Sequence, residues 1–150
     1  MANTIEVGAY LITLHTYQQE CLFGAIVDGV MQLNEIGQIA VDEWGRLSKK
    51  RQEIELDQWA IMPNHILAIV RVKTKVNLPE SVSLVKQRHQ GKPRSLSSFV
   101  AGFKAAAAKR INLVRNQPGL PVWQRSYQER LIRDEITLQR MRQIILNPSH

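Results

Sequence analysis

The sequence predicts an α+β domain in which helices pack on one face of an antiparallel sheet. Several short segments place apolar residues at alternate positions, as strands do, and three longer segments repeat them every three or four positions, as helices do. The connections are mostly short, and 150 residues, 44% of them hydrophobic, suffice for the core of one domain. We therefore expect residues 1–150 to form a single domain.

The first part of the chain favours a strand, a weaker strand and a helix. Residues 9–16 are β-branched or aromatic and roughly alternate, which predicts the first strand. Residues 25–33 give a weaker strand signal, which the turn-forming pair Asp28-Gly29 interrupts. Asn34 is a suitable N-cap, and the apolar spacing after it predicts an amphipathic helix from residue 35 to about 49.

The middle of the chain predicts an antiparallel strand pair. Residues 53–61 alternate, with Leu56, Gln58 and Ala60 expected on one face, and their partner is the apolar run 66–72. The turn between them contains Pro63. Residues 73–94 are polar and lack periodicity, so we expect a long, mobile connection there.

The last part predicts a helix, an extended segment and a final helix. Ser95, Ser97 or Ser98 can cap a helix whose buried stripe reaches Val114, and the proline and glycine residues at 118–121 end it. Residues 122–133 should be extended. Asp134 then caps a last helix with Leu138, Met141 and Ile145 on its apolar side.

Several classes of protein are excluded by the composition. The longest apolar runs are far shorter than the ~20 residues of a membrane-spanning helix, and the N-terminus does not resemble a signal peptide. Cys21 is the single cysteine, which excludes an intramolecular disulfide and favours a cytoplasmic protein. The glycine-rich patterns of nucleotide-binding folds and serine hydrolases are absent.

The positive charge is concentrated in one segment. The chain has 20 Lys and Arg against 13 Asp and Glu, a net charge of +7, yet no acidic residue lies between Ser81 and Gln128. That segment holds nine basic residues: Lys86, Arg88, Lys92, Arg94, Lys104, Lys109, Arg110, Arg115 and Arg125. Such a cluster is typical of a surface that contacts phosphates. The alternatives are an ordinary solvated helix face, or a membrane surface, for which the alanine-rich apolar side is poorly suited.

The histidines suggest little chemistry by themselves. His15, His65, His89 and His150 form no pair at the spacing of a strand face or a helical turn, so a metal site would have to be assembled across the fold. His65 alone is more typical of a structural or surface histidine than of a metal ligand.

Five segments together resemble a known family. They are residues 21–24, the Met-Pro-Asn-His at 62–65, residues 103–116, the Trp-Gln-Arg-Ser-Tyr at 123–127, and the Ile-Arg-Asp-Glu at 132–135. They are similar, in order and over nearly the whole chain, to the REP-associated tyrosine transposases, which are single-tyrosine transposases of the HUH endonuclease superfamily. The resemblance implies a ferredoxin-like fold that recognises hairpin or single-stranded DNA at the ends of mobile elements, in a protein whose active relatives are homodimers.

The family's chemistry is also implied by this resemblance. Two histidines, separated by one hydrophobic residue, bind a divalent metal such as Mg²⁺ or Mn²⁺, which polarises the scissile phosphate. A tyrosine on the last helix then attacks that phosphate and forms a covalent phosphotyrosine.

This chain departs from the family at both positions. His65 is followed by Ile66 and then Leu67, which cannot be a ligand, so His65 is the remnant of the pair. The position of the nucleophile falls at Gln143 or Ile144, depending on the register, and neither is a tyrosine. Tyr127 is a weak candidate for a replacement nucleophile, against a packing or DNA-stacking role.

These observations leave three interpretations. We expect a transposase-like DNA-binding protein that is impaired in or lacks cleavage and strand transfer. One alternative is an active metal-dependent transposase with a rebuilt site, made from His65, Gln143 and Asp57 or Glu55. The other is a structural or protein-interaction domain. The predicted DNA contacts are the eight side chains Lys86, Arg88, Lys92, Arg94, Lys104, Lys109, Arg110 and Arg115, together with Trp123, Arg125 and Arg133.

Overall fold

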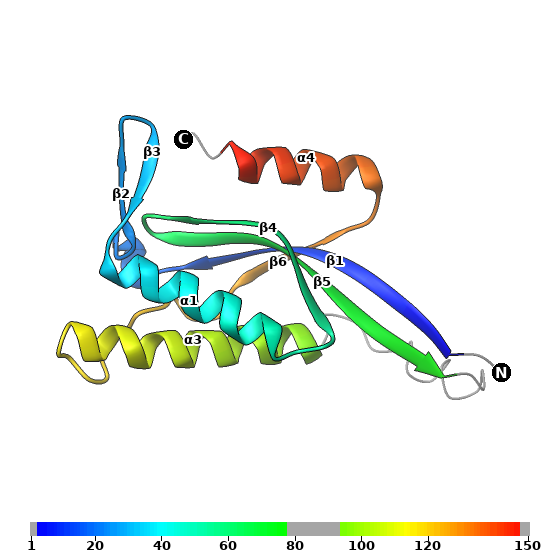
Figure 1. Cartoon of the computed structure of the whole chain (residues 1–150), viewed down its shortest axis with the longest axis horizontal. Coiled ribbons are helices and arrows are strands. Elements are labelled where there is room, and N and C mark those ends of the chain that lie inside the picture. Colours follow the sequence, from blue (N-terminus) through cyan, green and yellow to red (C-terminus); the bar gives the residue numbers. More distant parts are fainter. Residues whose placement is uncertain (1–2, 78–93, 148–150) are drawn as a thin grey trace.

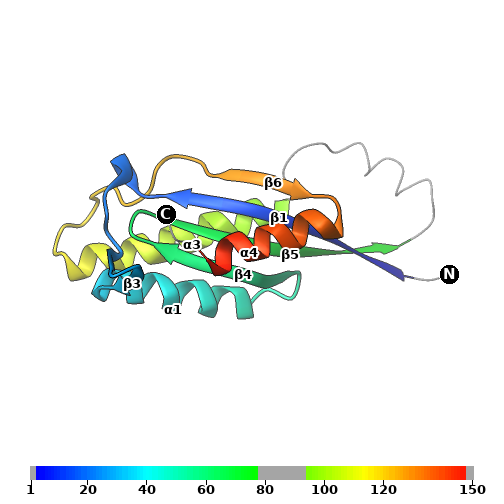
Figure 2. The same ribbon diagram turned by 90° about the horizontal axis from the view of Figure 1, so that it is seen from above.

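A four-stranded antiparallel sheet forms the centre of the molecule. The computed structural model describes residues 3–77 and 94–147. The strands lie in the order β4-β5-β1-β6, and Figure 2 shows β4 and β6 along the two edges. Their bounds are Asn3–His15 for β1, Ile54–Met62 for β4, His65–Asn77 for β5 and Gln128–Ile132 for β6.

Two helices connect these strands in the ferredoxin-like manner. Helix α1 (Glu35–Lys49) connects β1 to β4, and α3 (Arg94–Val114) connects β5 to β6. Strand β5 lies between β1 and β4, so the chain follows a β-α-β-β-α-β path with a split β-α-β unit. The predicted α+β class and the ferredoxin-like antiparallel sheet are therefore confirmed.

The helices cover both faces of the sheet, and the prediction of one covered face is wrong for the last helix. Helices α1 and α3 lie below the sheet in Figure 1, whereas α4 (Glu135–Leu146) lies above it. Ile66, Ala68 and Val70 of β5 pack in the core with α1 and α3, while Leu67 and Ile69 pack with α4. A strand that is apolar on both faces needs cover on both, which accounts for the position of α4.

A small hairpin precedes α1. The predicted weak strand at 25–33 is a two-stranded hairpin, with β2 at Gly24–Val27 and β3 at Val30–Leu33. Its two turn residues, Asp28 and Gly29, have φ of 53° and 78°, the positive values that a type I′ turn requires. A 3-10 turn at Tyr17–Gln19 links β1 to this hairpin.

Side-chain caps fix the start of two helices as predicted. The Oδ1 of Asn34 accepts a hydrogen bond from the backbone N of Gly37 at 2.8 Å, and α1 has the predicted bounds. Asp134 caps α4 in the same way, through the backbone N of Thr137 at 2.7 Å. The proposed serine cap of the helix that ends at Val114 is wrong, because α3 already begins at Arg94.

A β-bulge in β4 changes which residues face the core. Leu56 pairs with Val70 and Trp59 with Ala68, so the two residues between them oppose a single residue of β5. Leu56 and Trp59 consequently face the same core, whereas Ala60 faces α4. The predicted common face of Leu56 and Ala60 is wrong, because simple alternation cannot account for the extra residue.

The boundary of the predicted connection also needs correction. Strand β5 continues to Asn77, paired throughout with β1, so residues 73–77 belong to the sheet rather than to a loop. Residues 78–93 of the predicted mobile connection lie outside the described residues. In the described part of the chain, no helix has both the length and the apolar character needed to cross a bilayer.

Candidate functional site

Two of the predicted site segments, the Pro-Asn-His turn and the Trp-Gln-Arg segment, meet at one end of the sheet, where β1 ends and β5 begins. The backbone N of Thr16, directly after β1, donates to the carbonyl of Asn64 at 3.0 Å. The backbone N of Gln124 donates to the carbonyl of His15 at 2.9 Å, and Thr16 and Trp123 form a β-bridge. The end of β1 therefore connects the Pro-Asn-His turn with the Trp-Gln-Arg segment.

His65 faces a second histidine that the sequence reasoning did not pair with it. His15 and His65 are direct partners in the β1–β5 register, and their ring centroids are 5.6 Å apart. Burial lowers the pKa of His65, and the neighbouring His15 lowers it further. The signal for this pair is the register of two strands that are distant in sequence, which local patterns do not give.

Leu67, the position at which the resemblance implies a second histidine, is an apolar contact. It packs with Met141 and Ile145 of α4, on the face opposite to α1 and α3. Because side chains alternate along a strand, His65 projects from this same face. His65, Leu67 and α4 thus share one face of the sheet, and Leu67 contributes packing there.

Tyr127 belongs to the other face of the sheet. Its hydroxyl donates to Oε1 of Glu129 at 2.9 Å and lies 3.5 Å from Oγ of Ser97 in α3. Its ring packs against the core that the sheet forms with α1 and α3. Burial, together with Glu129, raises the pKa of Tyr127 to about 12. A phenol held protonated on the face opposite to His65 and α4 is poorly placed for attack on a phosphate near His65.

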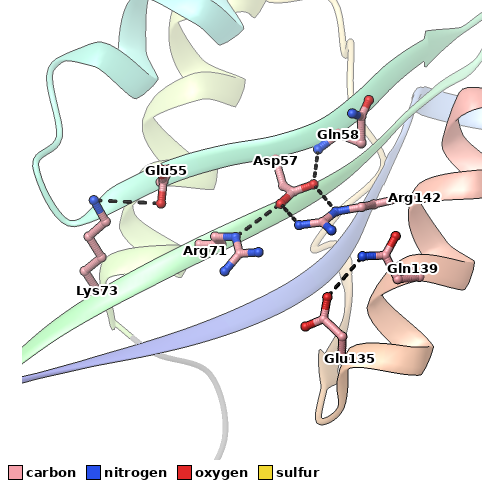
Figure 3. Close-up of polar contacts among 8 residues, drawn as sticks. All are labelled: Glu55, Asp57, Gln58, Arg71, Lys73, Glu135, Gln139 and Arg142. Carbon is pink, nitrogen blue, oxygen red and sulfur yellow. Dashed lines mark hydrogen bonds and ion pairs between the residues drawn. The ribbon is translucent and has the colours of Figure 1, made fainter.

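Asp57 cannot join His65 in the rebuilt site that the active-enzyme alternative requires. Its carboxylate accepts two hydrogen bonds from Arg142 of α4, at 2.8 and 2.7 Å, and one from Arg71 at 3.1 Å (Figure 3). It also lies opposite Ile69, four residues or about 13 Å along the strand from His65. Asp57 therefore holds α4 on the sheet.

Of the other members of the proposed rebuilt site, Glu55 is also far from His65. Glu55 pairs with Lys73, still farther from His65 along the sheet (Figure 3). Gln143 is exposed on α4. Among residues 3–77 and 94–147, no group of three or more His, Cys, Asp or Glu side chains is placed to hold a metal. The donors around His65 do not fit the Mg²⁺ or Mn²⁺ site that the resemblance implies, because Mg²⁺ prefers oxygen ligands.

A polar pocket opens beside His15. It has a volume of about 130 Å³ and is lined by His15 and five residues in a row, Gln124, Arg125, Ser126, Tyr127 and Gln128. Arg125 is exposed and has no ion-pair partner in the described part of the chain. The pocket thus combines a cationic side chain with amides that can donate and accept hydrogen bonds.

Lys104 and Trp123 hold the backbone segment that lines this pocket. The Nζ of Lys104 donates to the carbonyls of Gln124 and Ser126, at 3.0 and 2.5 Å. The indole of Trp123 donates to the carbonyl of Lys104 at 3.1 Å, and its ring packs beside those of Phe23 and Phe103. The ring of Trp123 is partly buried against the core, and its contact with DNA stays a prediction.

Two of the predicted DNA-contacting arginines have structural partners. Arg110 forms ion pairs of 2.6 Å with both Asp42 and Glu43, which connect α3 to α1. Arg115 donates to Oδ1 of Asn112 and to the carbonyl of Pro121, so it closes the turn after α3. Both guanidinium groups are held by acceptors within the protein and are less suited to contact phosphates.

The remaining predicted contacts divide into exposed and undescribed residues. Lys109 and Arg133 are exposed and have no ion-pair partner among residues 3–77 and 94–147. Arg94 is the first residue of α3, and its side chain lies outside the described part of the structure. Lys86, Arg88 and Lys92 lie outside the described residues.

Comparison with known proteins relates the chain to a bacterial protein of similar sequence. No protein-family model matches the chain. It is 34% identical over 137 residues to an uncharacterized protein of Haemophilus influenzae, and the match covers 89% of this chain and 75% of that protein. The chain belongs to the family of that protein.

Solved structures of transposases have the same fold. One is a REP-associated tyrosine transposase bound to a REP hairpin, with a TM-score of 0.55 and 16% identity over 94% of this chain. The match spans 66% of that transposase, just under two thirds of its length. A candidate transposase from Deinococcus radiodurans R1 also gives a TM-score of 0.55, with 18% identity, over 95% of this chain and 91% of its own. This chain thus has the fold of these two solved structures.

Proposed function

We propose that this protein is a DNA-binding member of the single-tyrosine transposase group that recognises hairpin or single-stranded DNA and has lost most or all of its ability to cleave it. The observation that carries the proposal is the shared fold with a transposase bound to a REP hairpin, over 94% of this chain. Two of the motifs that resemble the REP-associated transposases, the Pro-Asn-His turn and the Trp-Gln-Arg segment, lie at the end of the sheet around His15, His65 and the pocket.

The charge distribution supports binding to a polyanion. Arg125 and Lys109 belong to the segment without acidic residues, both are exposed, and neither has an ion-pair partner in the described structure. A phosphate that contacts such a cation displaces counterions, which provides affinity. Arg125 is the best-placed contact, because it lines a pocket that offers hydrogen bonds to a nucleotide as well.

The geometry around His65 supports the loss of cleavage. Leu67 packs against α4 on the face where the second histidine is needed. The two candidate positions for the nucleophile, Gln143 and Ile144, are both exposed on α4 and carry no hydroxyl. If cleavage survived, it would require a divalent metal such as Mg²⁺ or Mn²⁺ at a site that the described residues do not complete.

The resemblance further suggests a homodimer, and the single cysteine favours a location in the cytoplasm. We include both in the proposal, since active relatives are dimers. Light scattering coupled to size-exclusion chromatography gives the molecular mass directly, and a monomer at micromolar concentration would remove this part of the proposal.

Salt dependence of DNA binding tests the role of Arg125. Fluorescence anisotropy with a labelled single strand containing a hairpin gives the association constant at several salt concentrations. We expect log K to fall linearly with log salt, and Arg125→Ala to lower the slope by about 0.7, the value for one phosphate contact on a single strand.

Lys50→Ala provides the matched control for this experiment. Lys50 is an exposed cation that caps α1, outside the acid-free segment. Its replacement should leave the slope unchanged. Equal effects of the two replacements would indicate only a general charge effect, and absence of binding by the unmodified protein would refute the proposal.

A further inference from the structure

The two facing histidines at the end of the sheet have the geometry of a pair of metal ligands. His15 is the last residue of β1 and His65 the first of β5, and the two are direct register partners. Their ring centroids are 5.6 Å apart and their planes are inclined by 37°. Two imidazoles bound to one ion at about 2.1 Å per nitrogen, at a tetrahedral angle, have centroids roughly 5 Å apart. The separation of the two rings is therefore close to that of two imidazoles bound to one ion.

The hydrogen bonds of the two rings favour the same role. The Nδ1 of His65 lies 2.8 Å from Oδ1 of Asn64, so Nδ1 carries the proton and Nε2 has the free lone pair. The carboxamide of Asn64 is itself held, since its Nδ2 donates to Oε1 of Gln19 at 3.2 Å. An acceptor that orients the second nitrogen of a histidine in this way is typical of metal ligands.

His15 has a ring nitrogen without a partner. Its Nδ1 is buried and makes no hydrogen bond with the described residues. A buried polar atom without a partner is uncommon and costs free energy unless a water molecule or an ion satisfies it. The ring of His15 is thus not engaged in a competing hydrogen bond.

We propose that His15 and His65 together bind one borderline divalent cation, such as Zn²⁺, Ni²⁺ or Cu²⁺. Imidazole nitrogens favour these ions over Mg²⁺, which prefers oxygen. The pair spans two strands and uses His15 in place of a second histidine on β5. Arg125 lines the same pocket as His15, but it is exposed, and solvent screens its repulsion of a cation. The site does not depend on whether the protein binds DNA.

Calorimetric titration with Ni²⁺ tests the pair. The protein is the full chain without an affinity tag, with Cys21→Ser, because the exposed thiol of Cys21 could bind the ion by itself. We expect one site per chain, and His15→Ala or His65→Ala should each weaken it at least about tenfold. Asn64→Ala, which keeps both ligands but removes the orienting acceptor, should weaken it about tenfold.

The other two histidines provide the control. His89→Ala and His150→Ala should each leave the affinity unchanged. Binding that persists when both His15 and His65 are replaced, or that is lost with His89 or His150, would overturn the proposal, as would absence of binding by the unmodified chain.

A second measurement covers the case in which a variant fails to fold. Ni²⁺ is paramagnetic, so it broadens the NMR signals of nuclei near its site. In the Cys21→Ser chain with both histidines present, substoichiometric Ni²⁺ should first broaden the signals of residues 15 and 65. Broadening that begins elsewhere would place the ion at another site and refute the assignment.

Discussion

Asp57 fixes the last helix to the sheet through a single carboxylate. Only 11% of its side chain is exposed, and it receives charged hydrogen bonds from Arg142 of α4 and Arg71 of β5 (Figure 3). The bond from Arg142 contributes most to lowering the pKa of Asp57 to about 2. Asp57 lies in the β-bulge, where the extra residue changes the direction of the strand. The bulge and the ion pair with Arg142 thus lie at the same point of β4.

Asp57→Asn should make the protein less stable at neutral pH and remove a step in its acid sensitivity. The pKa of Asp57 is lower in the folded protein than in the unfolded chain, so the charged pair stabilises the fold above about pH 4. That contribution disappears as the pH falls from about 4 to about 2. We expect a loss of about 2 kcal/mol in the free energy of unfolding at pH 7, and a smaller difference from the unmodified protein toward pH 2.5.

Urea denaturation at a series of pH values measures this difference. Glu55→Gln is the matched control, because the neighbouring pair of Glu55 and Lys73 is about half exposed and should contribute less than about 1 kcal/mol. A difference for Asp57→Asn that stays constant between pH 7 and pH 2.5 would contradict this explanation.

Single-residue roles were predictable only where the chemistry is local to the sequence. The expectation that Leu67 shares a face with His65 follows from period-two alternation within one strand, and the packing of Leu67 is consistent with it. The pairing of His15 with His65 depends on the register of strands 50 residues apart, and the structural partners of Arg110 lie on a different helix. No local sequence pattern encodes such contacts. The positive charge of Arg110 therefore predicted a contact with DNA, which its ion pairs with Asp42 and Glu43 do not support.

Helix α1 contains two glycines in different surroundings. A Cβ added to Gly37 would lie 2.3 Å from the carbonyl oxygen of Phe23, whereas one added to Gly45 would meet nothing within 4 Å. The close approach at Gly37 allows the loop before the hairpin to pack against the first turn of the helix. Gly45 has no such role, and it only lowers the helix propensity.

The two alanine replacements should therefore change stability in opposite directions. Gly37→Ala forces the helix and the loop apart and should lower the free energy of unfolding by about 1–3 kcal/mol. Gly45→Ala should raise it by up to about 1 kcal/mol. Urea midpoints of both variants, compared with the unmodified protein, provide the test. A Gly37→Ala variant as stable as Gly45→Ala would show that the close approach does not constrain the helix.

At the scale of elements, the predictions succeeded where a cap and a periodic pattern coincide. Asn34 and the spacing after it gave both ends of α1, and Asp134 gave the start of α4. The sequence of α4 did not predict which face of the sheet the helix covers, because an amphipathic helix can pack against any apolar surface. The bulge in β4 was not predictable from alternation, since one extra residue leaves the composition of the strand unchanged.

The whole molecule has the fold of the solved transposase structures, and we propose that it has lost their cleavage chemistry. The fold of the chain, with its four-stranded sheet and the helices α1, α3 and α4, is similar to that of the REP-associated transposase over 94% of this chain. The net charge of +7 predicted an anionic partner, and the structure narrows the surface by assigning Arg110 and Arg115 to internal contacts. Arg125, Lys109 and Arg133 remain exposed among the predicted DNA contacts whose side chains the structure describes.

The most direct test is to analyse the same binding reaction on a native and on a denaturing gel. The purified chain is incubated with a labelled single strand that contains a hairpin, in the presence of Mg²⁺ or Mn²⁺. We predict a retarded band on the native gel and only free, full-length DNA on the denaturing gel, because the protein holds the strand without forming a phosphotyrosine. A retarded band that survives denaturation, shortened DNA, or no retardation on the native gel would contradict the account.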